Sequence, residues 1–587
     1  MSPHDMLEDQ DPPRLTAEEL KKYFPAETRP VLPGAFELGL VLAGTVSAGA
    51  YTGGVLDFLF EALDAWQRAK DADDPNAPRH NVVITTVAGA SGGAISGAIL
   101  LRGAGREFEH GQSLDNPFYS AWTRGVDLMK LLSLQGDDAG FSSLFNTRAI
   151  EETANTTITW DKGRPLGTST SPAQRKYLAD PLRLFMMVGN VTGIPYEIPM
   201  RGESGLGHDL VSHADYMRFA LTVPGGPDAQ LASRPDEFAL ASGSTTNWGF
   251  VRDAALATSA FPLAFRARLL QRGLPMTAYR ALAIPTPSGP PDIRQLVPLW
   301  RLLPRGESDT KVAPFANVDG GTFNNEPLDV ARTAMAGLAS FNERTPDSAT
   351  RAVVMVDPFS DADMLSVPDI GDLTAMILPL LSSMLAQSRF KPEDVALAYD
   401  EDVYSRFLVA PVRRDAAGQP IVGARAIASG GLGGFLGFVD SRLLDHDYML
   451  GRVNAQAFLA RHLMLPEDAN NPLFASWTAA QKNKYRYIDP KTGTKYLPIV
   501  PLMDSVTVPP PPQWPTGVTL PANFDKAVEA RLDSIFAKLK QELLPKSGLV
   551  RALSSGGLGV AWSLFIRKGL RDAIHKVFQE GLQKQGL

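Results

Sequence analysis

The most informative residues for chemistry are a serine enclosed by small residues, Gly89-Ala90-Ser91-Gly92-Gly93. The segment follows an apolar run at 82–88 and precedes a stretch of helical periodicity at 92–101, which predicts a sharp turn between a strand and a helix. Such a turn would lift the hydroxyl of Ser91 clear of the sheet edge, and the amide of Gly92 at the helix start could stabilise an oxyanion. The pattern predicts a nucleophilic serine, although the same small residues could serve close packing alone.

A serine nucleophile needs a base, because its hydroxyl stays protonated at neutral pH. The best candidate is Asp319, which follows the apolar run 315–318 and is therefore expected at the end of a strand. Gly320 and Gly321 come next and would let another backbone or a ligand approach the carboxylate. The alternative is a turn residue that caps a helix beginning near Pro327.

A second glycine-bounded loop follows the first apolar run at 36–42 and reads Gly44-Thr45-Val46-Ser47-Ala48-Gly49. Backbone amides of this loop could add donors to an oxyanion hole beside the serine turn. The spacing of the two outer glycines also fits the GxxxxG of a phosphate-binding loop. Ala50 and Tyr51 stand where that motif requires Lys and then Ser or Thr, so the sequence disfavours nucleotide binding.

The chain contains eight histidines and no cysteine. None of the histidines has a recognisable metal-ligand spacing, and the sequence predicts neither a metal site nor a cofactor. His446, in Leu-Asp-His-Asp-Tyr, is the best candidate for the third member of a Ser-Asp-His triad. A salt-bridged histidine on a helix explains the same residues.

The composition is that of an ordinary globular protein, with 587 residues, 44% apolar and 21% charged, and a net charge of −7. This balance leaves no basic excess for a nucleic-acid footprint, so no nucleic-acid partner is predicted. Residues 1–13 are acidic and polar, unlike a secretory signal, and no apolar run reaches the roughly 18 residues of a membrane span. These features predict a cytoplasmic protein that is soluble or touches a membrane from the side.

The elements that must position the candidate residues follow from two apolar runs, 36–42 and 82–88. Each leads through a glycine-rich turn into a helical stretch, which predicts an α/β fold with a largely parallel sheet. Further strands are expected at 184–191, 315–318 and 352–356. We predict an N-terminal extension, an α/β domain with insertions and a mainly helical C-terminal region, at 1–35, 36–360 and 361–587. Helices of the last region are expected at 371–389, 441–464, 522–543 and 560–584.

The last of these segments, 560–584, has the pattern of a basic amphipathic helix, with Trp562 and Phe565 near its start. A helix of this kind suits the surface of an anionic membrane, so peripheral membrane contact is one hypothesis for it. Docking on the rest of the protein is the alternative interpretation.

Four blocks lie between residues 36 and 340. They are the loop at 44–49, the GxSxG turn, the Asp-Gly-Gly segment with Asn-Asn-x-Pro after it, and Ala257-Thr-Ser-Ala-Phe-Pro-Leu-Ala-Phe265. Together they resemble the patatin-like phospholipase family, in particular a larger bacterial branch. The resemblance implies a three-layer α/β fold with Ser91 as nucleophile and Asp319 as base, and no histidine. It also implies hydrolysis of acyl esters of membrane lipids, of the phospholipase A type, without calcium or another cofactor.

The loop at 44–49 departs from the usual form of that family. Thr45 and Val46 stand where glycines are usual, and Ala48 stands where a Lys or Arg is usual. Because β-branched residues rarely adopt positive φ, we expect a changed backbone path that still presents an amide from residues 44–46 to the oxyanion. Two other functions stay open: a Ser-Asp-His esterase acting on soluble esters, and a lipid-binding or interaction protein that keeps the fold without the chemistry.

Overall fold

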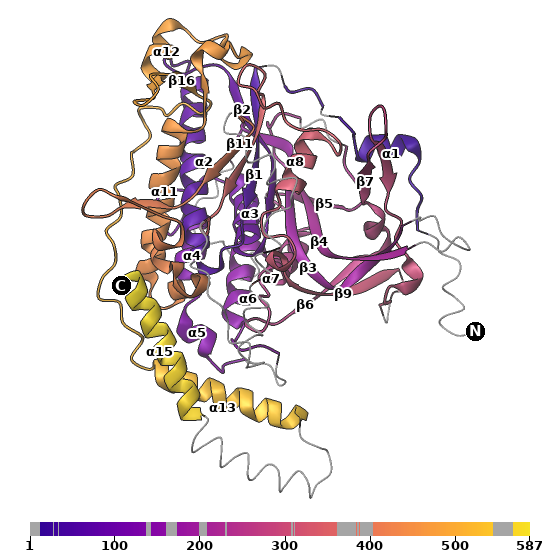
Figure 1. The fold of residues 1–587 in the computed structure, drawn as a ribbon, viewed down its shortest axis with the longest axis vertical. Coiled ribbons are helices and arrows are strands. Elements are labelled where there is room, and N and C mark those ends of the chain that lie inside the picture. Colours follow the sequence, from indigo (N-terminus) through magenta and orange to yellow (C-terminus); the bar gives the residue numbers. More distant parts are fainter. Residues whose placement is uncertain are drawn as a thin grey trace, which may run out of the picture.

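The computed structural model describes residues 12–27, 29–32, 34–136, 142–159, 173–198, 208–228, 232–306, 309, 311–360, 383, 387, 403–543 and 567–587. A nine-stranded sheet lies at the centre of the molecule, with helices on both faces (Figure 1). Its strands are β1 Ala35–Leu42, β2 Asn81–Gly89, β3 Leu178–Ile198, β4 His208–Thr222, β5 Glu237–Ala241, β6 Arg268–Gly273, β9 Val312–Asp319, β10 Arg351–Val356 and β11 Arg406–Val409. The predicted α/β class with a mostly parallel sheet is confirmed.

The strand order is β11-β10-β1-β2-β3-β4-β5, and every neighbouring pair except β3 with β4 is parallel. The long strand β3 has β4 along one side. Its other side is shared by β2 and, further along, by β9, which runs antiparallel to β3 and carries β6 on its outer edge. Because β2 and β9 border the same side of β3 in opposite directions, their carboxyl ends point toward each other.

The central strands are apolar because both of their faces are covered. All eight residues of β1 are buried, and its side chains alternate between two cores. Leu42 joins the core beneath α2 Gly49–Asp71, α3 Ser91–Ala104, α7 Trp248–Thr258 and α11 Ser441–Arg461. Val41 joins the core beneath α8 Leu328–Ala336 on the opposite face. The sheet therefore lies between two layers of helices, which gives a three-layer fold and explains why its central strands are apolar on both faces.

The structure corrects several predicted boundaries. The strand expected at 184–191 extends over all of β3, and its antiparallel partner β4 was not predicted. The α/β domain also contains the helix α4 Pro117–Arg124, which was not among the expected elements. The helix expected at 441–464 ends at Arg461 because the short strand β14 Met464–Pro466 follows it. Apart from residues 383 and 387, the helix expected at 371–389 lies outside the described residues.

Residues beyond 360 take part in the same layers. β11 adds a parallel strand to β10, and α11 lies against α2 at very short range. A Cβ on Gly54 would lie 1.9 Å from the carbonyl oxygen of Tyr448, and one on Gly451 would lie 2.2 Å from that of Tyr51. Glycine is therefore required at this helix crossing. The domain division at residue 360 stays a prediction, and strand pairing crosses it.

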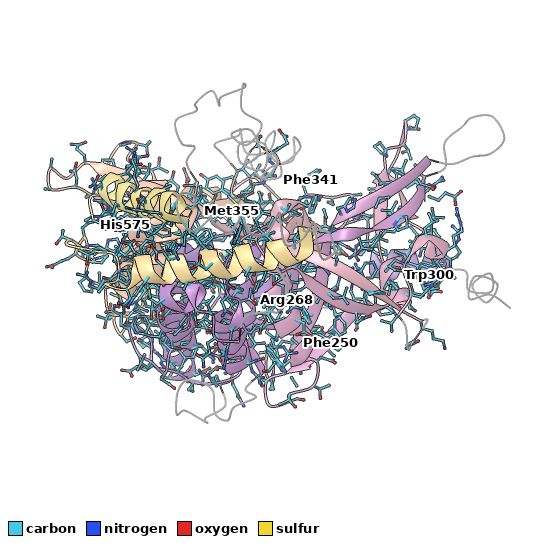
Figure 2. All side chains as sticks on the ribbon, turned by 90° about the horizontal axis from the view of Figure 1, so that it is seen from below. Phe250, Arg268, Trp300, Phe341, Met355 and His575 are labelled. Atoms are coloured by element: carbon cyan, nitrogen blue, oxygen red, sulfur yellow. The ribbon has the colours of Figure 1, made fainter. Side chains whose placement is uncertain are left out.

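The C-terminal helices α13 Phe524–Leu543 and α15 Arg567–Gln585 pack together on this assembly. Figure 2 shows α13 crossing the underside of the molecule, with His575 of α15 at one edge. Phe578 and Leu582 of α15 are buried with Phe524 of α13 and Leu443 of α11. The described part of the predicted amphipathic helix thus docks on its own protein. None of the described helices is long and apolar enough to cross a membrane.

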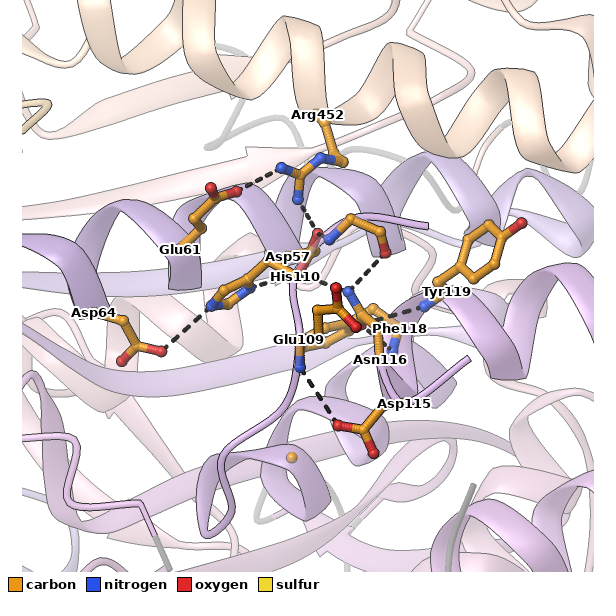
Figure 3. Close-up of polar contacts among 12 residues, drawn as sticks. Asp57, Glu61, Asp64, Glu109, His110, Asp115, Asn116, Phe118, Tyr119 and Arg452 are labelled. Carbon is orange, nitrogen blue, oxygen red and sulfur yellow. Dashed lines mark hydrogen bonds and ion pairs between the residues drawn. The ribbon is translucent and has the colours of Figure 1, made fainter. Parts of the chain in front are cut away.

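A buried network of charges joins α2 to α11 (Figure 3). Asp57 of α2 accepts a hydrogen bond from the hydroxyl of Tyr448 at 2.7 Å and forms an ion pair with Arg452. Nδ1 of His110 lies 2.8 Å from Oδ1 of Asp57, and its Nε2 lies 3.5 Å from Oδ2 of Asp64. Burial by itself lowers the pKa of His110, but the hydrogen bonds and charges of the two carboxylates outweigh burial and raise the pKa to about 9.

This raised pKa makes stability depend on pH. Because the folded-state pKa of His110 exceeds the ordinary value, the charged pair stabilises the fold fully below about pH 6.5 and loses its effect as pH rises through about 9. We expect His110→Asn to lower the midpoint of thermal unfolding at neutral pH, and the difference from wild type to shrink between about pH 7.5 and 9.5. Differential scanning calorimetry measures the unfolding midpoint of each protein, with the exposed His462→Asn as control. A difference that stays constant across this range would contradict the role of the charged imidazole.

Candidate active site

Ser91 lies where β2 ends and α3 begins. Its φ of 49° falls in the left-handed region, which is rare for a residue other than glycine and is typical of a strained turn that presents its side chain. A Cβ on Gly93 would lie 2.1 Å from the carbonyl oxygen of Leu42, and one on Gly89 would lie 2.7 Å from the amide nitrogen of Ala94. Both glycines are therefore required by close packing, and the strained serine stands between them.

The register of three strands brings Ser91 to Asp319. Gly89, the last residue of β2, lies opposite Met186 of β3, and Asp319, the last residue of β9, lies opposite Val188. The two carboxyl ends thus meet two residues apart on the same side of β3. The Ser91 hydroxyl donates a hydrogen bond to Oδ2 of Asp319 at 2.6 Å, although 228 residues separate the two in the chain.

The environment of Asp319 favours a proton on its carboxylate. The residue is 4% exposed, and burial raises its pKa to about 7, against the hydrogen bonds from Ser91 and from the Gly321 amide, which lower it. Among the described residues, no cation forms an ion pair with this carboxylate. A carboxylate with a pKa near neutrality is well matched to accept a proton from a hydroxyl and return it.

The segment 257–265, the fourth block singled out in the sequence, holds the backbone of both residues. The hydroxyl of Thr258 accepts a hydrogen bond from the Ser91 amide at 2.8 Å, and the carbonyl of Ala260 accepts one from the Asp319 amide at 2.9 Å. Ser91 therefore uses its own amide for positioning, and any oxyanion donor must come from other residues.

The loop at 44–49 packs against the first turn of α3 with an unusual backbone. Val46 has a φ of 49°, an outlier for a β-branched residue, whereas Thr45 has a φ of −138°. A Cβ on Gly92 would lie 2.2 Å from the hydroxyl oxygen of Thr45. The amides of Gly44, Thr45 and Gly92 donate to no acceptor among the described residues. These amides are the candidate oxyanion donors of the site.

A carboxamide that the sequence analysis did not assign to the site lies between two of its glycines. A Cβ on Gly44 would lie 2.2 Å from Oδ1 of Asn325 and 3.3 Å from Cβ of Ser91, and one on Gly321 would lie 2.4 Å from the same Oδ1. Nδ2 of Asn325 donates to the Glu326 side chain at 2.8 Å. Its only signal in the sequence was the Asn-Asn-x-Pro string that follows the Asp-Gly-Gly segment.

Comparison with known proteins agrees with this geometry. A family model described as patatin-like phospholipase matches residues 40–332, which contain both Ser91 and Asp319. The uncharacterized protein y4iI of Sinorhizobium fredii (strain NBRC 101917 / NGR234) is 30% identical over 551 residues, covering 86% of this chain and 76% of that protein. The chain belongs to the patatin-like phospholipase family. The resemblance drawn from four sequence blocks is thereby confirmed.

The patatin-like domain contains an apolar pocket of about 100 Å³ that Ser91 and Asp319 both line. Its walls come from α3, α4, α7 and neighbouring segments, and include Ile95, Ile99, Trp122, Leu256, Phe265 and Phe438. Phe438 lies outside the range matched by the family model, so the region beyond residue 360 supplies part of the wall. Among the described residues, no three or more His, Asp or Glu side chains cluster closely enough to hold a metal ion.

His446, the candidate third member of a triad, is engaged elsewhere in this patatin-like protein. Its Nδ1 lies 2.8 Å from Oδ1 of Asp447, and its ring meets that of Trp514 edge-on at a centroid distance of 5.0 Å. Asp447 in turn accepts hydrogen bonds from the amides of Ala428 and Ser429. No histidine occurs among the described residues that line the pocket. The geometry favours the interpretation of a structural histidine on a helix.

The pKa of Asp319 gives the expected pH profile of ester hydrolysis. A base must be ionised to act, and the pKa of this carboxyl is raised to about 7, so kcat/KM should rise about tenfold per pH unit below pH 7 and level off above it. Initial rates on a short-chain p-nitrophenyl ester between about pH 5 and 9 measure this profile, with the uncatalysed rate subtracted at each pH. A plateau that extends down to about pH 5 would contradict a base with a raised pKa.

The contact of Gly44 with Asn325 and Ser91 predicts a second outcome. In Gly44→Ala the new methyl group would collide with the Asn325 carboxamide beside Ser91, so the loop must shift away from the position of an oxyanion. Because loss of one oxyanion donor costs about a hundredfold or more in rate, we expect kcat to fall by about that factor. Gly249→Ala is the matched control, since a Cβ there meets nothing within 4 Å. Full activity of Gly44→Ala would exclude a role for the present loop path.

Proposed function

We propose that this protein is a serine lipid acyl hydrolase of the phospholipase A type, which cleaves acyl esters of membrane lipids. The observation that carries the proposal is the 2.6 Å hydrogen bond from Ser91 to the buried carboxylate of Asp319 in an apolar pocket. Membership of the patatin-like phospholipase family supports a carboxylic ester hydrolase. The substrate class and the roles of the two residues are part of the proposal.

In the proposed reaction, Asp319 takes the hydroxyl proton of Ser91 as Oγ attacks the ester carbonyl. The amide of Gly92 and an amide of residues 44–46 stabilise the oxyanion of the tetrahedral intermediate. Collapse of this intermediate breaks the ester bond, the departing alcohol takes the proton from Asp319, and the acyl group remains on Oγ. Water then attacks the acyl-enzyme with Asp319 again as base, which releases the fatty acid and restores Ser91.

The lining of the pocket supports an acyl chain as the group bound beside Ser91. Apart from the catalytic pair, the walls are mostly aliphatic and aromatic, so a fatty chain gains free energy by leaving water there, roughly 0.8 kcal/mol for each buried CH₂. A polar head group would lose hydrogen bonds in the same space without finding replacements. The acyl chain is therefore expected to enter the pocket and the head group to remain outside.

Contact with the membrane that holds such a substrate remains a hypothesis. The predicted contact segment, 560–584, is described from Arg567 onward, and there Phe578 and Leu582 are buried against the protein. Leu570 and Val577 are the large apolar side chains of described α15 that stay exposed, at 41% and 49%. We propose peripheral and transient contact with the lipid surface in place of stable insertion.

Substitution of the proposed pair tests the mechanism. We expect Ser91→Ala and Asp319→Asn each to lower ester hydrolysis by at least about a thousandfold, and the double variant to be little worse, because residues that act as a unit lose their effect once. The assay measures fatty acid released from phospholipid vesicles and p-nitrophenol released from a short-chain ester.

His446→Asn is the matched control for this experiment and should keep its activity. If that variant lost activity while Asp319→Asn kept it, a Ser-Asp-His esterase would be the better account. A serine-reactive fluorophosphonate probe should label the wild type and not Ser91→Ala. Wild-type protein that neither reacts with the probe nor hydrolyses any ester would support the alternative of a lipid-binding protein without catalysis.

A further inference from the structure

A second cavity, of about 220 Å³, lies on the other face of the sheet from the pocket of Ser91. Its walls come from α1 Ala17–Tyr23, β3, β4, α8 and the segments near residues 232 and 280. Along β3, Leu184 and Met186 face the core beneath α3, whereas Arg183 and Phe185 face this cavity. The sheet therefore separates the two sites, and Figure 1 shows α1 and α8 on the side away from α2 and α11.

The charged side chains on the wall of this cavity are mostly cations. The cations are Lys22, Arg183, Arg218, Arg234 and Arg280, and Asp329 is the acid among the described lining residues. Four of the five cations are arginines that extend from strands or loops toward the same space. Three acids behind the wall, Asp215, Asp236 and Glu237, pair with them.

These acids are shared between arginines and do not balance them. Oε2 of Glu237 lies 3.1 Å from Nε of Arg183 and also accepts from Nε of Arg218. Asp236 and Asp215 in turn share the guanidinium of Arg280.

Asp236 is also held by Arg234, and Asp215 is also paired with Arg272, which lies behind the wall. With Lys22, Arg272 and Asp329 included, the named groups are six cations and four acids, a net charge of +2 among them.

Arg218 is a buried cation that the protein compensates only in part. It is 8% exposed, its Nε is used by Glu237, and its two terminal nitrogens have no acceptor among the described residues. Burial, together with repulsion from Arg234, lowers its pKa to about 10 despite the nearby carboxylate. Its guanidinium carbon lies 5.2 Å from the centroid of the Phe185 ring, which holds the group over an apolar surface. A buried cation with free donors is costly unless a counter-charge reaches it.

We propose that this cavity binds a small soluble anion with phosphate or carboxylate groups, which the free donors of Arg218 hold and Lys22 contacts at the α1 wall. Guanidinium groups suit such ligands because their planar donors match two oxygens at once. The bound anion would neutralise the excess charge and satisfy donors that the protein leaves free. The site is separate from the ester hydrolysis proposed above, and its test does not depend on that activity.

Isothermal titration calorimetry with inorganic phosphate, pyrophosphate and citrate tests this site in the full chain. We expect at least one of the three to bind wild type with a Kd below about 1 mM, and Arg218→Gln to raise that Kd at least about tenfold, as loss of a charge-assisted hydrogen bond does. Lys22→Gln should raise the Kd about threefold or more. Lys21→Gln is the matched control, because Lys21 is the preceding residue of α1 but does not line the cavity, and its Kd should match wild type.

Two results would overturn the proposal. One is that wild type binds none of the three anions up to about 10 mM, and the other is that wild type and Arg218→Gln have equal Kd values. If Arg218→Gln unfolds, the test uses Arg218→Lys and the two lysine variants. Equal effects of Lys21→Gln and Lys22→Gln on the Kd would mean non-specific attraction and would also overturn the proposal. A second experiment uses phosphatidylglycerol vesicles. If the protein binds these vesicles in a way that depends on Arg218 but binds no soluble anion, the site belongs to a lipid head group, and the proposal of a soluble ligand is overturned.

Discussion

The candidate site depends on one constraint of the sheet: β2 and β9 run toward each other along the same side of β3. Because the two carboxyl ends meet head to head, Asp319 at the end of β9 lies within hydrogen-bond reach of Ser91, which follows β2, although 228 positions of sequence separate them. The other features of the site hold the two residues in position. Thr258 and Ala260 hold the backbones of the two residues, and the glycines of the serine turn let α3 start directly against β1.

Part of this arrangement could be predicted from the sequence and part could not. The apolar runs of β1, β2 and β10 and the small residues around Ser91 are local patterns, so the parallel core and the strand-to-helix turn followed from them. The length of β3 and its pairing with β4 did not, because Pro181, Gly193 and Pro195 interrupt the apolar pattern of β3 and polar residues are frequent in β4. Asn325 could not be assigned either, since its contact with Gly44 depends on the meeting of two segments distant in the chain.

Buried carboxylates have opposite environments in different parts of this molecule. Asp57 and Asp64 have charged or hydrogen-bonding partners that outweigh their burial, so their pKa values are lowered and they stabilise contacts between segments as permanent anions. Asp319 has two hydrogen-bond donors and no cation among the described residues, and its pKa is raised. The carboxylate beside the strained Ser91 is thus one that no cation of the described residues compensates. A cost in folding stability at that position is the expected counterpart of its reactivity.

Residues beyond 360 supply Phe438 to the pocket wall and β11 to the sheet. Their contribution has a practical consequence for recombinant work on this chain. A fragment cut at the end of the range matched by the family model, residue 332, would lose β10 as well as β11 and would leave the hydrogen-bonding edge of β1 bare. An apolar strand edge without a partner pairs readily with other chains. Such a fragment would also expose the side of α2 that α11 covers. Aggregation during expression would then reflect the chosen cut, and would say nothing about the chemistry of Ser91.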